Sequence, residues 1–257
     1  MVKAIFFDVD GTLVSHKMKA VPESSRRALE KLAEKGILRV LATGRHMSEL
    51  EQLPVRGIPF DGYITLTGQL TLDGEGKVLA GSPIAGADKE TLIRLFNEKT
   101  IPLSLVEKDR MYINFVDANT EAAQHAISSP VPELGEYTGE EIYQAVAYLD
   151  EAGGQKLAKL LPGCKAFRWD TYGIDIYSAT GGKTVGIGQY LQAMGIRQEE
   201  TMAFGDGEND MDMLQYVQTG VAMGNAEACL KEIADYVTDT VEEDGLYKAL
   251  AALGVLE

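Results

Sequence analysis

The stretch AIFFDVDGT at residues 4–12 decides the fold. Its four consecutive apolar residues are typical of a strand that is buried on both faces, as strands of parallel sheets are. Asp-Val-Asp-Gly follows, and a glycine at that place lets the chain turn sharply. In open parallel sheets, ligands bind beyond the carboxyl ends of the strands. This stretch therefore indicates an α/β fold with a ligand site near Asp8 and Asp10.

The same alternation of strand and helix continues on both sides of the chain's middle block. Helices are predicted at 22–35, 183–194, 209–217, 225–235 and 245–253, and strands at 37–42, 62–66, 201–204, 219–223 and 236–238. The block between them mixes helices with longer amphipathic strands and lacks a strand–turn motif of the opening type. We therefore expect a doubly wound parallel sheet, a Rossmann-like core formed by residues 1–82 and 181–257, with an inserted α+β domain at residues 83–180.

Composition and charge narrow the class of protein. The 257 residues suffice for one large domain or two modest ones, and 45% hydrophobic with 25% charged residues is the usual globular mixture. This mixture argues against disorder and against a coiled coil. The net charge is −15, which makes the chain a poor partner for nucleic acid, because binding nucleic acid needs a basic face. We expect most of the acid to serve solubility and some of it to surround a metal.

The cysteines and the hydropathy indicate where in the cell the protein is located. Cys164 and Cys229 lie far apart and form no CxxC motif, so we expect two buried, reduced thiols rather than a disulfide framework. No stretch approaches the roughly 20 apolar residues of a membrane span. The apolar run near Met1 is too short for a secretory signal. We therefore expect a cytoplasmic protein that does not bind a membrane.

Polar side chains gather at the predicted strand ends. They are Asp8 and Asp10 after the first strand, Thr43 and Gly44 after the second, Asp206, Asn209 and Asp210 after strand 201–204, and Lys183 at the start of a helix. Carboxylates that pack together raise each other's pKa unless a cation compensates them. An all-oxygen cluster without Cys or His suits a hard cation, and we expect Mg²⁺. An Asp that only caps the next helix would explain one such position, but not all of them.

Four of these segments resemble the motifs of a known family. DVDGT at 8–12, Thr43 after a strand, Lys183 downstream and GDGEND at 205–210 look like the four motifs of the haloacid dehalogenase-like (HAD) phosphatases. The order and spacing agree over nearly the whole chain. The inserted block resembles the large C2 cap of the Cof-type subgroup, which would close over the site, exclude bulk water and select the leaving group.

The resemblance implies an activity. It points to a Mg²⁺-dependent phosphoric monoester hydrolase that acts on small phosphate monoesters, sugar phosphates or related metabolites, through an aspartyl phosphate. A carboxylate that attacks a phosphate dianion faces repulsion between like charges. A metal ion and the Lys183 ammonium would offset that repulsion and stabilise the charge on the transferring group.

The resemblance also assigns roles residue by residue. Asp8 is the nucleophile, and Asp10 is the general acid and base, whose backbone carbonyl ligates Mg²⁺. Asp8 and Asp206 ligate Mg²⁺ through their side chains, and Asp210 supports these ligands without binding the metal itself. The phosphate group is bound by the backbone at Val9 and by Thr43, Gly44, Asn209 and Lys183, of which Lys183 also pairs with Asp8.

Two short motifs depart from familiar patterns. Many members of the family carry Asn-Gly after the third strand, where this chain has Thr67 and Gly68. Thr keeps a hydroxyl but lacks the amide, so we leave Thr67 outside the site. Residues 182–184, Gly-Lys-Thr, resemble the end of a P-loop, but the glycine that this motif needs at position 177 is Tyr177. Nucleotide binding by a P-loop is therefore not expected.

Three further side chains have roles that the motifs do not define. We expect Arg45, which follows Thr43-Gly44, to pair with a nearby acid rather than with phosphate. Trp169 and Tyr172 either line a substrate pocket or belong to the core of the inserted domain.

Other functions use similar residues. A phosphomutase would form the same aspartyl phosphate but return the phosphoryl group to another substrate hydroxyl. A phosphoacceptor signalling module also combines acids, a Thr and a Lys around Mg²⁺, but its acceptor does not lie on the first strand and no large domain interrupts it. A protein that only binds would not need every catalytic residue. As partner we expect a small phosphorylated metabolite, and as assembly a monomer or a weak homodimer.

Overall fold

The computed structural model describes residues 1–127 and 129–256. The chain divides into two compact units, Met1–Ala80 with Gly182–Glu257, and Gly81–Gly181. We call the first the core unit and the second the inserted unit. Each unit has a sheet and a hydrophobic core of its own.

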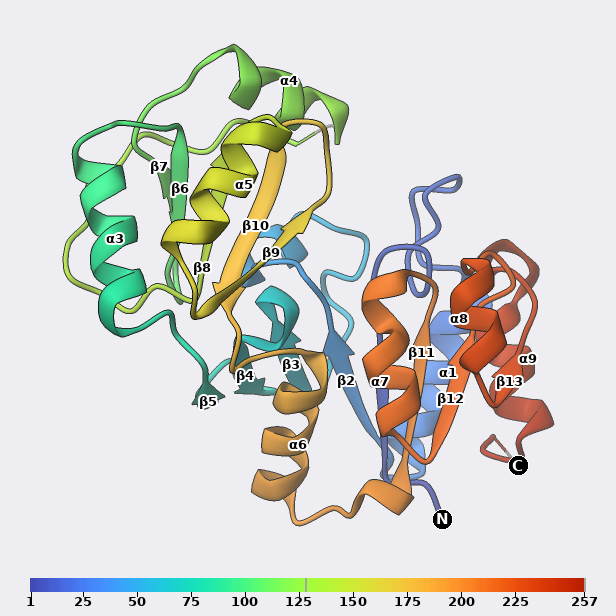
Figure 1. The fold of residues 1–257 in the computed structure, drawn as a ribbon. Coiled ribbons are helices and arrows are strands. Elements are labelled where there is room, and N and C mark those ends of the chain that lie inside the picture. The colour runs from blue at the N-terminus through green and yellow to red at the C-terminus, as the bar shows by residue number, and fades with distance from the viewer. Residues whose placement is uncertain (128, 257) are drawn as a thin grey trace. The chain divides into compact units, whose positions relative to one another are not determined.

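Within the described residues, the core unit has an eight-stranded sheet of order β13-β12-β11-β1-β2-β3-β4-β5 (Figure 1). The strands from β13 to β3 are parallel to their neighbours, and β4 pairs antiparallel with β3. Their bounds are β1 Ala4–Phe7, β2 Leu38–Ala42, β3 Gly62–Thr65, β4 Leu70–Asp73, β5 Val78–Gly81, β11 Thr201–Gly205, β12 Thr219–Ala222 and β13 Tyr236–Val237. The parallel order puts β1 between β11 and β2.

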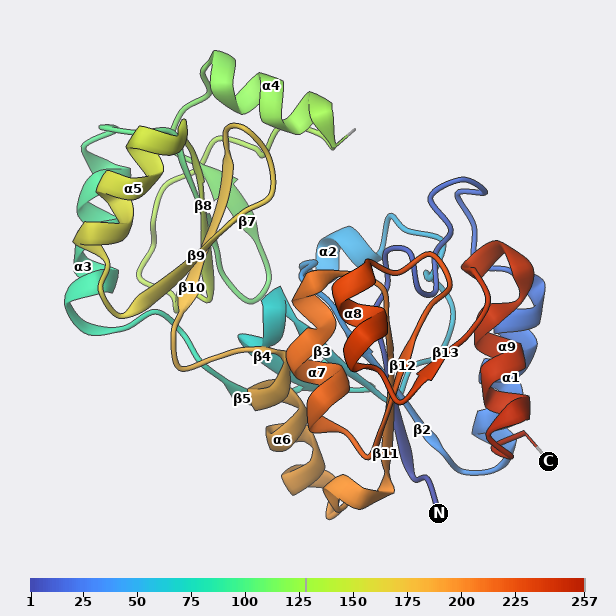
Figure 2. The same ribbon diagram turned by 45° about the vertical axis from the view of Figure 1, so that its right-hand side comes forward.

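Helices cover both faces of this sheet. The bounds are α1 Glu23–Glu34, α2 Met47–Leu50, α6 Lys183–Met194, α7 Met211–Tyr216, α8 Ala228–Ile233 and α9 Gly245–Ala252. Side chains of α1 and α9 pack with Ile5 and Phe7, whereas side chains of α6, α7 and α8 pack with Ala4 and Phe6. Figure 2 shows α1 and α9 side by side. Successive residues of a strand point to opposite faces, which is why the AIFF run is buried on both sides.

The inserted unit is built differently. Its strands form a sheet of order β7-β6-β8-β10-β9 with antiparallel pairing of β6 with β7 and β8, and of β10 with β8 and β9. The bounds are α3 Gly86–Asn97, β6 Leu103–Val106, β7 Met111–Ile113, α4 Ala118–Ala126, β8 Gln144–Tyr148, α5 Glu151–Leu160, β9 Cys164–Arg168 and β10 Gly173–Ser178. Leu92 and Phe96 of α3 and Leu157 of α5 pack on the apolar residues of the sheet.

The parallel sheet with helices on both faces, and the separate antiparallel sheet, confirm the predicted α/β fold class with an α+β insertion. Two predicted helices are shorter than expected. The segment 209–217 is a 3₁₀ turn at Glu208–Asp210 followed by α7, and the segment 225–235 is helical only over Ala228–Ile233. Within this 3₁₀ turn, Asp210 is buried whereas Glu208 is exposed.

Two smaller expectations are also tested. Both cysteines are unpaired, as predicted, but they are half-buried instead of buried. Among the described residues, none of the helices has the length and apolar character that crossing a membrane requires.

Candidate active site

Three neighbouring parallel strands place polar residues at one edge of the core sheet. Phe7 at the end of β1 is in register with Phe204 of β11 and Leu41 of β2. The residues that follow these strand ends therefore lie close together, and they include Asp8 and Asp206.

Lys183 is the cation at the centre of this edge. It is the first residue of α6, it is 3% exposed, and it is the only lysine in the buried set of described residues. Its Nζ donates to Asp8 Oδ1 at 2.8 Å and to Asp210 Oδ1 at 2.5 Å. A buried ammonium that bridges two carboxylates holds both side chains in fixed positions.

Asp210 is fully buried and is held from two sides. While Oδ1 accepts from Lys183, Oδ2 accepts the backbone N–H groups of Asp206 at 3.0 Å and Gly207 at 3.2 Å. The carboxylate reaches these groups because Gly205 has no side chain, since a Cβ there would lie 2.6 Å from the Cβ of Asp210. Asp210 thus fixes the turn that carries Asp206.

Asp206 reaches the turn after β1. Thr12 Oγ1 donates to Asp206 Oδ1 at 3.3 Å, and a Cβ on Gly11 would lie only 2.0 Å from Asp206 Oδ2. Gly11 also has a φ of +81°, in the left-handed region that favours glycine. Only glycine at this position allows both the turn and the close approach of the carboxylate.

The carboxylates of this edge outnumber the cations that they contact. Burial, and then the charge of Asp210, raise the pKa of Asp8 well above its ordinary value. The same two causes raise the pKa of Asp206 to about 6. Burial lowers the pKa of Lys183, but Asp210 and Asp8 more than offset that, and the net shift is upward. One ammonium therefore leaves negative charge without compensation.

The residues fit a divalent cation. Carboxylate oxygens of Asp8, Asp206 and Asp210 all lie within 4.8 Å of one another. The donors are oxygen atoms only, which suits a hard cation better than a thiophilic one. Asp210 is fully buried and accepts hydrogen bonds from Lys183 and from two backbone N–H groups, whereas Asp206 is half-buried and, within the described part of the chain, accepts only two longer hydrogen bonds, at 3.2 and 3.3 Å. Asp8 and Asp206 are therefore the carboxylates best able to bind the cation directly.

This charge imbalance predicts a pH effect on stability without metal. The ordinary pKa of Asp206 is 3.8 and its value in the folded state is about 6, so the folded state loses stability as pH rises between the two. The shift corresponds to about 3 kcal/mol, which solvent at this partly exposed carboxylate reduces to about 1–2 kcal/mol. In chelator, Asp206→Asn should therefore unfold at a higher temperature than the wild type near neutral pH.

Thermal unfolding at several pH values measures this effect. The advantage of Asp206→Asn should shrink as pH falls toward 4 and disappear below about pH 3, where the carboxyl group of the wild type is protonated in both states. Adding Mg²⁺ near neutral pH should stabilise the wild type more than the variant. A wild type that is the more stable protein in chelator at every pH would contradict the charge imbalance.

The loop after β2 is held by a strained segment after β3. Thr43 is buried, and its carbonyl accepts the Thr67 N–H at 3.0 Å, while the Arg45 carbonyl accepts the Leu66 N–H at 3.2 Å. Leu66 and Thr67 both have positive φ, 53° and 55°, which costs of order 1–3 kcal/mol for each such residue. Thr67, which we left outside the site, thus braces the Thr43–Arg45 loop through its backbone.

The next residue of this segment contacts the start of α6. A Cβ on Gly68 would lie 2.0 Å from the carbonyl oxygen of Gly182 and 2.6 Å from the backbone nitrogen of Lys183. The segment therefore contacts both the loop that carries Thr43 and the backbone that carries Lys183.

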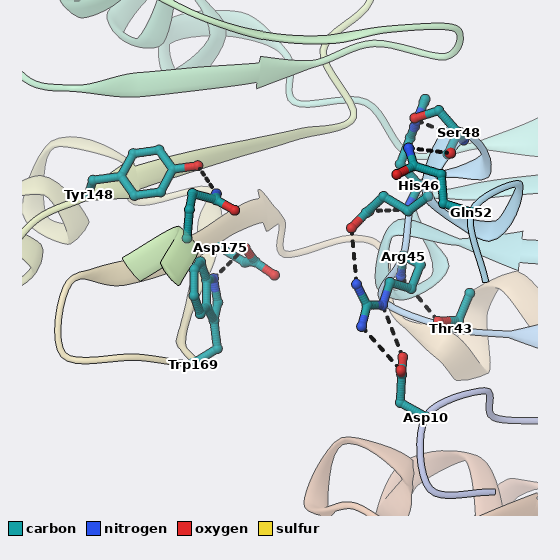
Figure 3. A network of polar contacts seen from close by, with 11 residues as sticks. Asp10, Thr43, Arg45, His46, Ser48, Gln52, Tyr148, Trp169 and Asp175 are labelled. Atoms are coloured by element: carbon teal, nitrogen blue, oxygen red, sulfur yellow. Dashed lines mark hydrogen bonds and ion pairs between the residues drawn. The ribbon is translucent and has the colours of Figure 1, made fainter. Parts of the chain in front are cut away.

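Asp10 lies outside the Asp8–Asp206–Asp210 group. Its two oxygens accept from Arg45, Oδ2 from Nε at 3.0 Å and Oδ1 from Nη2 at 3.1 Å, and Figure 3 shows the guanidinium facing the carboxylate. Arg45 also donates to Glu49 Oε1 at 3.3 Å. The prediction that Arg45 pairs with a nearby acid is confirmed.

The other predicted phosphate-binding positions differ in exposure. Val9 is buried, and its carbonyl accepts the backbone N–H groups of Leu13 and Val14. Asn209 is exposed, and its Oδ1 lies against Gly207. Val9 is thus fixed by the turn that contains it, whereas Asn209 sits at the surface of the strand-end turn.

One residue at this edge was missed from the sequence. Asn225 follows β12, and its Nδ2 donates to the Gly11 carbonyl at 2.8 Å and to Asp206 Oδ2 at 3.2 Å. Its Oδ1 accepts the Val241 N–H at 3.1 Å. Asn225 therefore links the turn after β1 to the carboxylate after β11.

The sequence did not decide whether Trp169 and Tyr172 of the inserted unit line a substrate pocket or belong to its core. Trp169 is half-buried, and its indole N–H donates to Asp175 Oδ1 at 2.9 Å, as Figure 3 shows. Its ring also lies against Gly173 in the neighbouring strand. Tyr172 is exposed. Trp169 thus packs within the sheet of its own unit.

Comparisons with known proteins place these features in a family. The sequence profile of the haloacid dehalogenase-like hydrolases matches residues 5–250. YkrA of Bacillus subtilis, a candidate phosphatase, is 32% identical over 258 residues, which cover 99% of each chain. A solved phosphatase of the haloalkanoate superfamily from Bacteroides thetaiotaomicron has a TM-score of 0.88 and 35% identity, with 99% of this chain and 96% of the other covered. A solved sugar phosphatase of HAD subclass IIB has a TM-score of 0.81 and 32% identity, with 99% and 100% covered.

Proposed function

Because the chain belongs to the haloacid dehalogenase-like hydrolases and is a phosphatase, we propose that it hydrolyses small phosphate monoesters through an aspartyl phosphate at Asp8, with Mg²⁺ as cofactor. The substrate class that we propose is sugar phosphates or related metabolites. We also propose a cytoplasmic location, in keeping with two unpaired cysteines.

One observation carries the proposal. Lys183 bridges Asp8 and Asp210, whereas the carboxylate of Asp10 pairs with Arg45 instead. Two carboxylates two residues apart therefore have different surroundings, and different surroundings are what separate a nucleophile from a general acid and base.

The first step transfers the phosphoryl group to Asp8. One oxygen of Asp8 accepts from Lys183, and Oδ2 accepts no hydrogen bond from the described part of the chain, so Oδ2 is the oxygen that attacks phosphorus. The bond from phosphorus to the ester oxygen breaks, and Asp10 donates its proton to that oxygen. The alcohol leaves and Asp8 carries the phosphoryl group.

The second step regenerates the enzyme. Asp10, now ionised, takes a proton from water, and the water oxygen attacks the phosphorus atom on Asp8. The bond between phosphorus and Asp8 breaks, and inorganic phosphate leaves. Lys183 remains beside Asp8 through both steps and offsets the negative charge of the transferring group.

The remaining residues bind the metal and the phosphate group. Side chains of Asp8 and Asp206 and the carbonyl of Asp10 would hold Mg²⁺, which supplies positive charge to the phosphoryl oxygens. The Val9 N–H, which has no acceptor in the described part of the chain, would donate to a phosphate oxygen. Thr43, Gly44, Asn209 and Lys183 complete the proposed phosphate site.

The proposed substrate class is based on the inserted unit and on the similarity to a solved sugar phosphatase. We propose that residues 83–180 are a cap that selects the leaving group. The solved sugar phosphatase is 32% identical to this chain and covers 99% of it, which supports sugar phosphates as the class to test first.

Metal removal tests the proposal. Chelation should abolish release of inorganic phosphate from sugar phosphates, and Mg²⁺ should restore it. Ca²⁺ should restore it poorly, because its larger and looser coordination shell misplaces the nucleophile relative to phosphorus. The measurement is phosphate release with each ion after exhaustive dialysis. Full activity in excess chelator would contradict the proposed cofactor.

The same assay separates the alternatives. A hydrolase releases inorganic phosphate without an added bisphosphate, whereas a phosphomutase returns the phosphoryl group to a sugar. A signalling module would turn over at most once. Ranking phosphorylated metabolites by kcat/KM then identifies the leaving group, and size-exclusion chromatography distinguishes the expected monomer from a weak homodimer.

A further inference from the structure

Arg45 lies in the core unit and has no role so far in the proposed attack, metal binding or phosphate binding. Its side chain is 32% exposed, and that of Asp10 is 29% exposed. The two face each other in a bidentate pair with distances of 3.0 and 3.1 Å. A planar guanidinium that contacts both oxygens of a carboxylate fixes its orientation as well as its position.

Arg45 is itself held from the opposite side. Its backbone N–H donates to Thr43 Oγ1 at 3.1 Å, and its Nη1 donates to Glu49 Oε1 at 3.3 Å. The other oxygen of Glu49 accepts the His46 N–H at 2.8 Å, which closes the capping box at the start of α2. A chain of contacts thus runs from the start of α2 through Glu49 and Arg45 to Asp10.

Asp10 needs such a support. It lies in the turn before Gly11, where the chain has left β1, and the oxygens of the Asp8, Asp206 and Asp210 group do not include its own. Within the described residues, only Arg45 forms hydrogen bonds with its carboxylate. Without Arg45, the half-exposed carboxylate would rotate among its rotamers in water.

We propose that Arg45 is a positioning residue that orients the carboxylate of Asp10 toward the leaving group, and that it does not bind the phosphate group. The inference rests on the proposed function, in which Asp10 transfers the proton. A proton transfer requires a separation of about 2.6–3.2 Å between heavy atoms, so a carboxylate that samples other rotamers spends less time in the reactive geometry.

Leaving-group dependence distinguishes the two roles of Arg45. The ratio kcat/KM reports the step that releases the alcohol, and an aryl phosphate needs little help from an acid, whereas an alkyl phosphate needs much. Arg45→Gln should lower kcat/KM about 10–100-fold with a sugar phosphate, within the roughly 10²–10⁴-fold that a positioned acid contributes, and far less with 4-nitrophenyl phosphate. An equal loss with both esters would overturn the proposal.

A double-mutant cycle provides the second test. In the Asp10→Asn background, Arg45→Gln should cost almost nothing, because the group that it orients is gone. A cost as large as in the wild type would show that Arg45 acts on phosphate directly, and would overturn the proposal. Arg45→Lys, which keeps the charge without the fork, should stay impaired with the sugar phosphate. Full rescue by Lys would also overturn it.

Controls separate folding from positioning. Arg56 lies near the same short helix, is 73% exposed and pairs loosely with Glu51 at 3.7 Å, so Arg56→Gln should leave both esters unchanged. Thermal unfolding shows whether Arg45→Gln folds, and Glu49→Gln, which removes the support behind Arg45, should reproduce a smaller loss with the same ester preference. If the wild type released no phosphate from any ester, the proposed function would fail, whereas additive losses in an active enzyme overturn only the role of Arg45.

Discussion

Asp8→Asn should lower kcat for every phosphate ester by at least about 10⁴-fold and prevent any covalent intermediate, because an amide oxygen does not displace the leaving group. The change is close to isosteric, and Lys183 keeps its contact with Asp210 at 2.5 Å. The fold should therefore persist, and burial of Asp8 should cost less once the side chain is neutral. Quenched-flow kinetics measures the fall in kcat, and intact-protein mass spectrometry shows whether a covalent intermediate forms.

Asp10→Asn is the matched variant for this experiment. It has the same chemical change two residues away, but it keeps the nucleophile. With an aryl phosphate it should form the aspartyl phosphate and then accumulate it, since an amide does not accept the proton of water. Mass spectrometry after an acid quench should find the phosphoryl group on Asp8. A phosphoryl group on Asp10, or on the Asp8→Asn variant, would reverse the assignment of the two carboxylates.

The sequence predicts the parts of the site that follow from strand order. Parallel strands end at the same edge of a sheet, so residues after β1, β2 and β11 must lie near one another whatever their separation along the chain. Asp8 and Lys183 are 175 positions apart, yet their side chains meet at 2.8 Å. Buried apolar runs that end in polar residues are enough to predict the carboxylates of this edge, whereas the pairing of Lys183, which begins a helix, with Asp8 is what the family resemblance implies.

The same reasoning extends to Asn225. The run at 219–223 is a strand that ends in Gly224-Asn225, and β12 pairs with β11 in parallel, so a polar residue after it belongs to the same edge. What such patterns do not contain is side-chain direction. The family resemblance pairs Asp8 with Lys183, but nothing in the sequence shows that the acid that Arg45 contacts is Asp10.

Backbone strain is also invisible in the sequence. Residues with positive φ are usually Gly or Asn, which the sequence reveals, but here Leu66 and Thr67 have positive φ. The contacts with Thr43 and Arg45 hold these residues in place, and such contacts exist only after the sheet has formed. A tertiary interaction thus overrides a local preference at the segment that braces the proposed phosphate loop.

Lys183→Met should lower both stability and activity, for separable reasons. The variant keeps a side chain of similar length but leaves the carboxylates of Asp8 and Asp210 buried without their common partner. Removing one member of a buried ion pair typically costs about 3–5 kcal/mol, so the unfolding free energy should fall by about that amount in chelator. Because Lys183 also offsets charge on the transferring phosphoryl group, kcat should fall by about 10²–10³-fold, while KM changes less.

A second substitution separates the two effects. Asp210→Asn, added to Lys183→Met, removes one of the uncompensated charges while keeping an oxygen that can accept the N–H of Asp206 or Gly207. Much of the lost unfolding free energy should then return, measured by denaturant titration. The value of kcat should not return, because the Lys183 ammonium beside the transferring phosphoryl group is still missing. If kcat recovered together with stability, Lys183 would act only as a buried counter-ion, and the proposed role in charge stabilisation would be wrong.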